Sequence, residues 1–340
     1  LFRHPVSDAF HNLDRQRFLG QAGCSDHRPA RRYRNKFPVY LVQQRPVIHV
    51  GQENDQRDHP AEAGITDVAI VIGTPHREGG NLYNAAAIAV GGKLVGYCHK
   101  LYLPNYGVFD EERYFRPSHQ CPVYIINGVS VGVNICEDVW YSIGPVSVQR
   151  AAGAELIVNI NASPYHHNKG HQREQMISTR ASDNEVLLAY VNTVGGQDEL
   201  VFDGASMVVN NEGNCQVLFP SFKTCLNSIE FQISEKGNFK IINSFEESKR
   251  SELQDLYDAL VLGTRDYIKK NNFSGAIIGS SGGIDSALTT VIAVDAIGAD
   301  KVKTFMMPYK YTANISIKDA KQLADNLGII HKVIHIDKMF

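Results

Sequence analysis

The sequence predicts two α/β domains in series: a layered domain of many strands and few helices, followed by a parallel, doubly wound sheet. Three observations support this prediction. The 340 residues correspond to about two domains at roughly 150 residues each. Short apolar runs separated by Gly, Asn and Pro turns dominate the chain from Thr66 to Val209. From Ser251 onward, apolar strands alternate with helical segments, which is typical of a parallel sheet.

The composition excludes several classes of function. Hydrophobic residues make up 43% of the chain and charged residues 21%, and the formal net charge is -2. We therefore expect no nucleic-acid partner, because a large basic surface is not indicated. We also expect no membrane partner, because no apolar run reaches the roughly 18 residues of a membrane span. The six cysteines contain no CxxC pair, so we expect free thiols in a reducing, cytoplasmic compartment.

The first domain is predicted to occupy residues 66–247. Its helices are expected over Val146–Ala152 and Glu174–Asn184. A polar stretch over Gly213–Glu247 is expected to close the domain and lead into a linker. The predicted strands are short apolar runs bounded by turn residues: Val68–Ile72, Ala85–Val90, Leu94–Cys98, Val123–Ile126, Val129–Ile135, Leu156–Ile160, Val186–Asn192 and Ala205–Val209.

The second domain is predicted over residues 248–340. Ser251 opens a helix that is expected to run to about Lys270, since Ser is a good N-cap residue. The elements that follow alternate between strand and helix: a strand over Ala276–Ile278, a helix over Ala287–Ile297, a strand over Val302–Met306, a helix over Ile317–Leu327 and a strand over Val333–Ile336.

Residues 1–65 differ from the rest of the chain. They are rich in arginine and histidine, and apolar periodicity is poor except at Val39–Val42 and Val47–Val50. Two interpretations stay open: a native but irregular N-terminal arm, possible disorder included, or a sequence altered by a reading-frame error. The chain begins at Leu1 without Met, so we expect a piece of a longer protein.

A glycine- and serine-rich loop lies between the strand Ala276–Ile278 and the following helix. It reads Gly279, Ser280, Ser281, Gly282, Gly283, Ile284, Asp285 and Ser286. Glycines allow close approach of the backbone to an anion, and a helix N-terminus presents free N–H groups. Asp285 disfavours a bare phosphate, so a cation such as Mg²⁺ is expected between them. The alternative is a tight turn with a helix-capping serine. The loop lacks the Walker A and GxGxxG patterns.

Two segments of the first domain carry the residue types of thiol chemistry. One runs from His99 to Phe115 and contains Lys100, and the other runs from Gly132 to Trp140 and contains Cys136. A cysteine that ends a strand and begins a turn lies near backbone N–H dipoles, which favour the thiolate. A thiolate can attack an amide carbonyl while a lysine stabilises the oxyanion. Taken by itself, a lone cysteine is more often a core residue.

These segments resemble two motifs of the nitrilase, or carbon–nitrogen hydrolase, superfamily, and residues 79–86 and 161–165 extend the resemblance. The SGGIDS loop resembles the pyrophosphate loop of N-type ATP pyrophosphatases. The combination, together with LPNYGVFDEERYF, is similar to the family of glutamine-dependent NAD(+) synthetases over residues 66–340. The resemblance implies an αββα glutaminase domain and a truncated Rossmann-like synthetase domain. The implied ligase reaction converts ATP, deamido-NAD(+) and glutamine into NAD(+), AMP, pyrophosphate and glutamate.

The resemblance also implies roles for individual residues. Cys136 matches the nucleophile, Lys100 the lysine of a Glu-Lys-Cys triad, and Glu111 an auxiliary carboxylate. Glutamine-binding positions match Tyr106, Ser163 and Lys169. The ATP-binding positions match the loop from Gly279 to Ser286, with Asp285 as the Mg²⁺ ligand. A homo-oligomer is implied for the full-length protein.

The sequence departs from the family pattern in three places. The triad glutamate belongs to a Phe-Pro-Glu-Leu type of segment, but Phe37-Pro38 is followed here by Val39. Asn168 precedes Lys169 where glycine is expected. The synthetase domain is short after Ser286, so the deamido-NAD(+) site is incomplete. We therefore expect little glutaminase activity and weak, Mg²⁺-dependent ATP binding. The alternatives are another amidotransferase-type ligase with the same two modules, or a catalytically incomplete fragment that only binds ATP.

Overall fold

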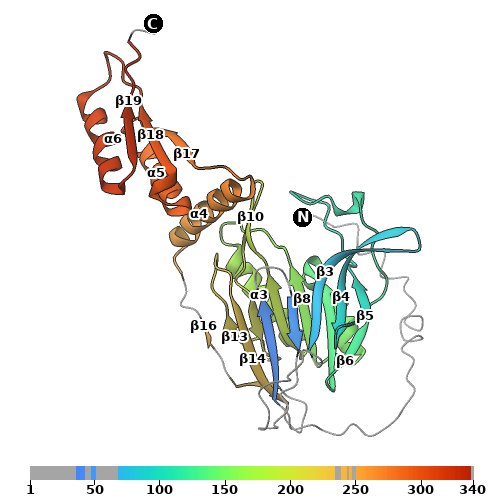
Figure 1. Cartoon of the computed structure of the whole chain (residues 1–340). Helices are drawn as coiled ribbons and strands as arrows, with labels where there is room; N and C mark the ends of the chain where they lie inside the picture. The colour runs from blue at the N-terminus through green and yellow to red at the C-terminus, as the bar shows by residue number, and fades with distance from the viewer. Residues whose placement is uncertain are drawn as a thin grey trace, which may run out of the picture.

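The computed structural model describes residues 36–42, 47–50, 68–233, 239–242, 245–246 and 250–337. Two seven-stranded sheets form its larger part (Figure 1). The first sheet is antiparallel throughout, and its strands follow one another across the sheet in this order: β15 (Phe239–Ile241), β14 (Leu226–Ile233), β1 (Lys36–Val42), β2 (Val47–Val50), β3 (Ala69–Glu78), β4 (Asn81–Val90) and β5 (Lys93–His99).

The second sheet is mixed. Its central strands β7, β8 and β9 are parallel, and antiparallel strands flank them. Because the parallel strands are covered on both faces, every residue of β8 and β9 is buried. The order across the sheet is as follows: β16 (Phe245–Glu246), β13 (Cys215–Leu218), β12 (Met207–Val209), β9 (Leu187–Asn192), β8 (Leu156–Asn161), β7 (Val129–Ile135) and β6 (Val123–Ile126).

The main hydrophobic core lies between the two sheets. Val71 and Ile88 of the first sheet belong to the same buried cluster as Val131, Val158 and Val191 of the second. Each fully buried side chain of this size contributes about 1.5–3 kcal/mol. At the start of β3, buried Ala69 and Val71 alternate with the more exposed Ile70 and Ile72, so one face of the strand turns toward this core and favours the observed register.

Helices α2 (Pro145–Ala151) and α3 (Lys169–Asp183) cover the outer face of the second sheet. Val146 from α2 and Ile177 and Ala181 from α3 pack against Leu188 and Val209 of the strands below. The predicted α/β class is confirmed. Of the expected αββα order, the described residues supply both sheets and this one helical layer.

The second α/β part starts at α4 (Glu252–Lys270), whose N-cap Ser251 accepts a hydrogen bond from the Gln254 N–H, as predicted. Three parallel strands follow in chain order: β17 (Ala276–Gly279), β18 (Val302–Met306) and β19 (Ile330–Val333). Their connections contain α5 (Ile284–Ile297) and α6 (Asn314–Leu327). Figure 1 shows these elements standing apart from the sandwich, with α4 between them.

Helix α4 is joined to the sandwich through a hairpin that the sequence did not predict, formed by β10 (Val194–Gln197) and β11 (Leu200–Asp203). The Gly196 N–H donates to Asp266 Oδ2 at 2.8 Å, and Gly263 packs on Gly196 without side chains between them. The hairpin was missed because its glycines and charged turn have the composition of a loop.

Two further sequence predictions need correction. The last strand is β19 at Ile330–Val333, which begins and ends three residues before the predicted Val333–Ile336, because α6 stops at Gly328 with φ +65° and the strand follows closely. Strand β3 continues to Glu78 rather than ending at Ile72, since its polar second half pairs fully with β4.

The apolar runs Val39–Val42 and Val47–Val50 lie in strands β1 and β2, between β14 and β3 of the first sheet. The rest of residues 1–65 is outside the described residues, so both interpretations of that segment stay predictions. Among the helices that the structure describes, none combines the length and hydrophobicity needed to cross a bilayer.

Candidate functional site

Cys136 directly follows β7 and is the first residue of a short 3-10 helix, η4 (Cys136–Val139). Its φ of +46° lies in the left-handed region. A non-glycine residue there costs on the order of 1–2 kcal/mol, and such strain is often stored at functional sites. The sharp turn places the thiol at the end of a central strand of the sandwich, as the sequence predicts.

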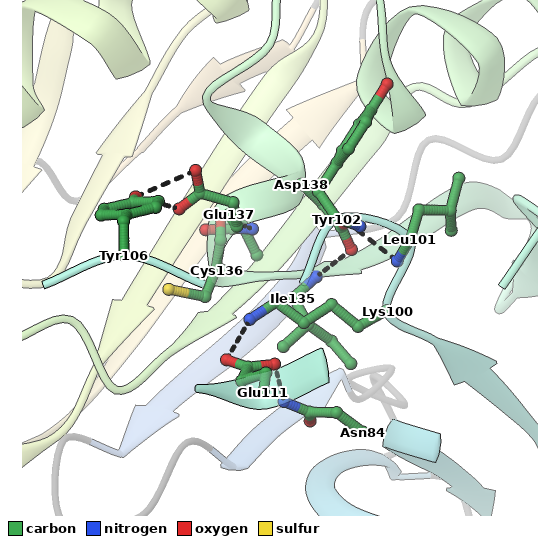
Figure 2. Close-up of polar contacts among 11 residues, drawn as sticks. Asn84, Lys100, Leu101, Tyr102, Tyr106, Glu111, Ile135, Cys136, Glu137 and Asp138 are labelled. Atoms are coloured by element: carbon green, nitrogen blue, oxygen red, sulfur yellow. Dashed lines mark hydrogen bonds and ion pairs between the residues drawn. The ribbon is translucent and has the colours of Figure 1, made fainter. Parts of the chain in front are cut away.

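Lys100 lies at the end of β5 and is 1% exposed. Its Nζ donates to Glu111 Oε1 at 2.7 Å, and Asn84 Nδ2 donates to Glu111 Oε2 at 3.1 Å. The Lys100 N–H also donates to the Asn84 carbonyl at 2.8 Å. Figure 2 shows Cys136, Lys100 and Glu111 gathered at one place. The lysine therefore has a fixed charge and a fixed position beside the thiol.

Asp138 connects the two segments that carry Lys100 and Cys136. Its Oδ1 accepts from the N–H groups of Leu101 and Tyr102 at 3.0 and 2.9 Å, and its Oδ2 accepts from the Ile135 N–H at 3.1 Å (Figure 2). One carboxylate therefore serves both the strand before the cysteine and the chain after the lysine.

Burial raises the pKa of the Cys136 thiol above its ordinary value. The charges of Lys100 and Lys169 oppose this rise, while those of Glu137 and Glu111 add to it. The sequence predicts that backbone dipoles favour the thiolate, but desolvation outweighs them here. At neutral pH the resting thiol is protonated, so reaction with an amide requires a proton acceptor.

The three predicted glutamine-binding residues come from different elements. Tyr106 is half exposed and its hydroxyl donates to Glu137 at 3.0 and 3.1 Å. Lys169 is the first residue of α3, and burial lowers its pKa. Ser163 is buried in the loop after β8, and its N–H donates to Asn192 Oδ1 at 2.9 Å. Tyr106 and Lys169 each interact electrostatically with the Cys136 thiol.

Asn168 explains one of the three departures from the family pattern. It is the N-cap residue of α3 and has a φ of +63°, the conformation that glycine adopts most readily. Asparagine is among the residues that tolerate the left-handed region best. The backbone turn that a glycine provides is therefore present, and Lys169 begins its helix beside the thiol.

A buried polar network beneath the site was not predicted from sequence. Arg173 pairs with Asp203 at 3.0 Å, and Asn192 Nδ2 donates to Asp203 at 3.3 Å and to the Ser163 carbonyl at 3.3 Å. A second chain of amides links Asn159 to Asn134 at 2.6 Å. The signal in the sequence was an asparagine inside an otherwise apolar strand, because such a side chain needs a buried partner.

The glycine–serine loop bounds a hollow of about 190 Å³ between the start of α5 and the middle of α6. Gly282 has a φ of +80°, and a Cβ there would lie 2.2 Å from the Ser316 carbonyl oxygen, so only glycine fits. The Ser280 hydroxyl is buried and makes no hydrogen bond to the described residues. Of the predicted loop residues, Ser280, Gly282, Gly283, Ile284 and Ser286 line this hollow together with Asp319 of α6, whereas Gly279, Ser281 and Asp285 do not line it.

A two-sheet α/β sandwich with a Cys–Lys–Glu cluster around a buried lysine, joined to a parallel α/β unit with a glycine-rich loop, defines a class of two-part α/β proteins. Within that class, the chain belongs to the carbon–nitrogen hydrolase family, whose sequence profile matches residues 61–235. The NAD synthase profile matches residues 256–340.

Relatives with both parts are glutamine-dependent NAD(+) synthetases. That of Acinetobacter baylyi is 44% identical over 273 residues, which are 80% of this chain and 50% of the relative. The synthetase of Aquifex aeolicus is 39% identical over 303 residues, and the match covers 81% of this chain and 53% of the relative. The chain spans about half the length of the curated relatives that it matches.

Solved structures give the same picture. The Acinetobacter baumannii glutamine-dependent NAD+ synthetase in complex with ADP has a TM-score of 0.75 and 41% identity, covering 79% of this chain and 51% of that one. The synthetase of Cytophaga hutchinsonii has a TM-score of 0.61 and 20% identity, covering 81% and 53%, and shares the fold.

Proposed function

We propose that the chain carries the glutaminase domain and the first part of the synthetase domain of a glutamine-dependent NAD(+) synthetase. Glutamine would supply ammonia to deamido-NAD(+) that ATP has adenylated, giving NAD(+), AMP and pyrophosphate. The observation that carries this proposal is the Cys136–Lys100–Glu111 cluster in a chain whose second part matches the NAD synthase family.

The first half-reaction would take place at Cys136. The thiol proton passes to a carboxylate while Sγ attacks the side-chain amide carbon of glutamine. The Lys100 ammonium stabilises the oxyanion that forms. When the tetrahedral intermediate collapses, the C–N bond breaks and the proton returns to the leaving ammonia. Water then hydrolyses the thioester to glutamate and the free thiol.

Glu111 and Glu137 are the carboxylates whose charges act on the thiol among the described residues. Glu111 accepts hydrogen bonds from Lys100 and Asn84, and Glu137 accepts one from Tyr106. Each carboxylate would therefore have to break or share a hydrogen bond to accept the thiol proton. The sequence offers no Phe-Pro-Glu segment for the triad glutamate that the resemblance implies, because Phe37-Pro38 is followed by Val39. We therefore expect acylation at a low rate, with Glu111 as a partial substitute.

Tyr106, Ser163 and Lys169 would bind glutamine. An ammonium group at Lys169 suits the α-carboxylate, and burial makes that pairing stronger than it would be in water. Ser163 would present its hydroxyl and backbone groups to the substrate. Its position is fixed by Asn192, which Asp203 holds in turn.

The loop from Gly279 to Ser286 would bind the ATP phosphates. The buried Ser280 hydroxyl without a partner and the N–H groups at the start of α5 fit an anion. Asp285 lies exposed in the first turn of α5, and Asp319 lines the hollow beside the loop. These hard oxygen donors fit Mg²⁺, which would neutralise the charge between the carboxylates and the phosphates.

The proposed domain limits are 66–247 and 248–340, with β1 and β2 completing the first sheet. We place the protein in the cytoplasm, where a reactive thiol stays reduced. A homo-oligomer is proposed for the full-length protein, as for the family.

The test is acylation of Cys136. The chain is incubated with glutamine or with a diazoketone analogue of glutamine, and the intact mass and the modified peptide are measured, together with ammonia release. We expect covalent labelling at Cys136 that glutamine slows, and loss of both signals in Cys136→Ala. If glutamine does not slow the labelling of Cys136, the proposed glutamine site is refuted, and ATP binding is the only proposed activity that remains for this chain.

A further inference from the structure

Two histidines face each other on the first sheet, outside the thiol site. His76 is on β3 and His99 on β5, with β4 between them (Figure 1). His76 Nδ1 lies 2.8 Å from His99 Nε2. Two neutral imidazoles can share this contact only if one nitrogen donates a proton and the other accepts it.

Aromatic rings hold both imidazoles in place. His76 stacks on Tyr97 with 3.6 Å between ring centroids and 9° between planes, and His99 stacks on Tyr83 at 4.2 Å and 7°. The two nitrogens therefore converge on a point that the surrounding side chains fix in advance. Such support favours ligand binding, because side chains that are already held in place lose little conformational entropy when a ligand binds.

A carboxylate completes the cluster. Glu78, two residues beyond His76 on the same face of β3, has its Oε2 4.0 Å from His99 Nδ1, and its side chain is 67% exposed. One ligand atom from each of the three residues can be chosen so that all lie within 4.8 Å of one another. The exposed Glu78 side chain can change rotamer, whereas the stacked rings stay in place.

We propose that His76, Glu78 and His99 form a binding site for a divalent transition-metal ion, with Zn²⁺ the favoured ion. The ion takes the place of the proton shared between the two imidazoles: the donor ring releases that proton from the shared contact and takes up one from solvent at its other nitrogen, so both rings stay neutral and no net proton is released. At Zn–N distances of about 2.0–2.1 Å and tetrahedral geometry, the nitrogens separate from 2.8 Å to about 3.3 Å.

The ligand set determines the class of metal. Two imidazoles and one carboxylate suit Zn²⁺, and imidazole also suits Ni²⁺ and Cu²⁺, whereas Ca²⁺ and Mg²⁺ prefer oxygen alone. Water fills the remaining position. The ion would join β3 to β5 across β4 and so restrain the strand end from which Lys100 follows. The site is separate from the proposed Mg²⁺ ligand Asp285.

The test is Zn²⁺ titration of the whole chain by calorimetry in a phosphine reductant. We expect one ion per chain, and affinity at least about tenfold lower in His76→Ala, with a smaller loss in Glu78→Gln. The matched control is His171→Ala, since His171 contacts Gln175 on α3, and its affinity should equal the wild type. Equal affinity in His76→Ala and wild type would refute the site.

Co²⁺ provides a second measurement on the unaltered chain, in case a variant misfolds. Nitrogen and oxygen ligands give visible d–d bands without a thiolate charge-transfer band. A strong thiolate band at one equivalent would assign the ion to a cysteine and overturn the proposal. Zn²⁺ should also raise the melting temperature of the wild type but not of His76→Ala, because only the former gains binding energy in the native state.

Discussion

The Lys100 ammonium and the Glu111 carboxylate form an ion pair with 2.7 Å between Nζ and Oε1, and their side chains are 1% and 18% exposed. Both residues lie in the segment that also carries Tyr106, and both charges act on the Cys136 thiol, in opposite directions. The pair therefore contributes to the ionisation of the cysteine, which burial dominates, and fixes the position of the lysine.

Removing the positive charge and removing the negative charge of this pair should shift the pKa of the Cys136 thiol in opposite directions. Lys100→Met removes a charge that lowers the pKa of Cys136, so the pKa should rise. Glu111→Gln removes a charge that raises it, so the pKa should fall. The pH dependence of alkylation at the Cys136 peptide, measured by mass spectrometry, provides the check. Shifts of the same sign would contradict the assignment.

Asp138 should make stability depend on pH. Burial raises its pKa to about 7, despite the opposing hydrogen bonds of the Tyr102, Ile135 and Leu101 N–H groups and the charge of Lys100. A carboxyl whose folded pKa exceeds its unfolded value of about 3.9 gives stability that is present at low pH and is lost as pH rises through about 7.

Asp138→Asn removes this titration. Its amide NH₂ would face a backbone N–H, a loss of about 1–3 kcal/mol. The free energy of unfolding of the wild type should fall relative to that of the variant between about pH 4 and pH 7. Denaturant titrations at several pH values measure this, and a constant difference would show that Asp138 does not titrate in that range.

Asn168 should matter for its backbone rather than its side chain, since the N-cap makes no side-chain hydrogen bond. Asn168→Ala should destabilise the chain by about 1 kcal/mol because alanine resists a φ of +63°. Asn168→Gly should be neutral within about 0.5 kcal/mol. Chemical unfolding of the three proteins measures this, and equal losses in both variants would indicate a role for the amide group.

Gly282 and Gly279 form a matched pair in the proposed ATP loop. A Cβ at Gly282 would meet the Ser316 carbonyl at 2.2 Å, whereas at Gly279 the nearest atom is Met307 Cε at 3.8 Å. We expect Gly282→Ala to abolish Mg²⁺-dependent ATP binding and lower the melting temperature, and Gly279→Ala to keep both. Calorimetric titration with ATP and Mg²⁺ measures this. Unchanged ATP affinity in Gly282→Ala would show that the loop does not bind ATP.

The role proposed for Asp285 is tested in the same way. Asp285→Ala should weaken ATP binding in the presence of Mg²⁺, because a carboxylate and a phosphate require the cation between them. Without Mg²⁺ the variant should bind ATP as well as the wild type or better, since a like charge has been removed. Equal Mg²⁺-dependent affinity in both proteins would refute the assignment.

Local patterns predicted much of this protein. Val129–Ile135 and Val302–Met306 are strands with the predicted limits, because apolar runs between turns have few other ways to bury their side chains. The loop around Gly282 was also predicted, because its backbone conformation and its N–H groups depend on residues that are adjacent in the sequence. Failures occurred at β10 and β11, where glycines form strands only because α4 packs on them.

The sequence by itself determined the α/β class, the order of most elements, and the residues around Cys136 and Ser286 that match known motifs. Only the tertiary structure decided that Asp138 joins the Lys100 and Cys136 segments, that Asp203 neutralises Arg173, and that His76 meets His99 across a strand. These contacts depend on strand register and on burial. Burial also reversed the predicted ionisation of Cys136, because desolvation is a property of the packed surroundings and not of the adjacent residues.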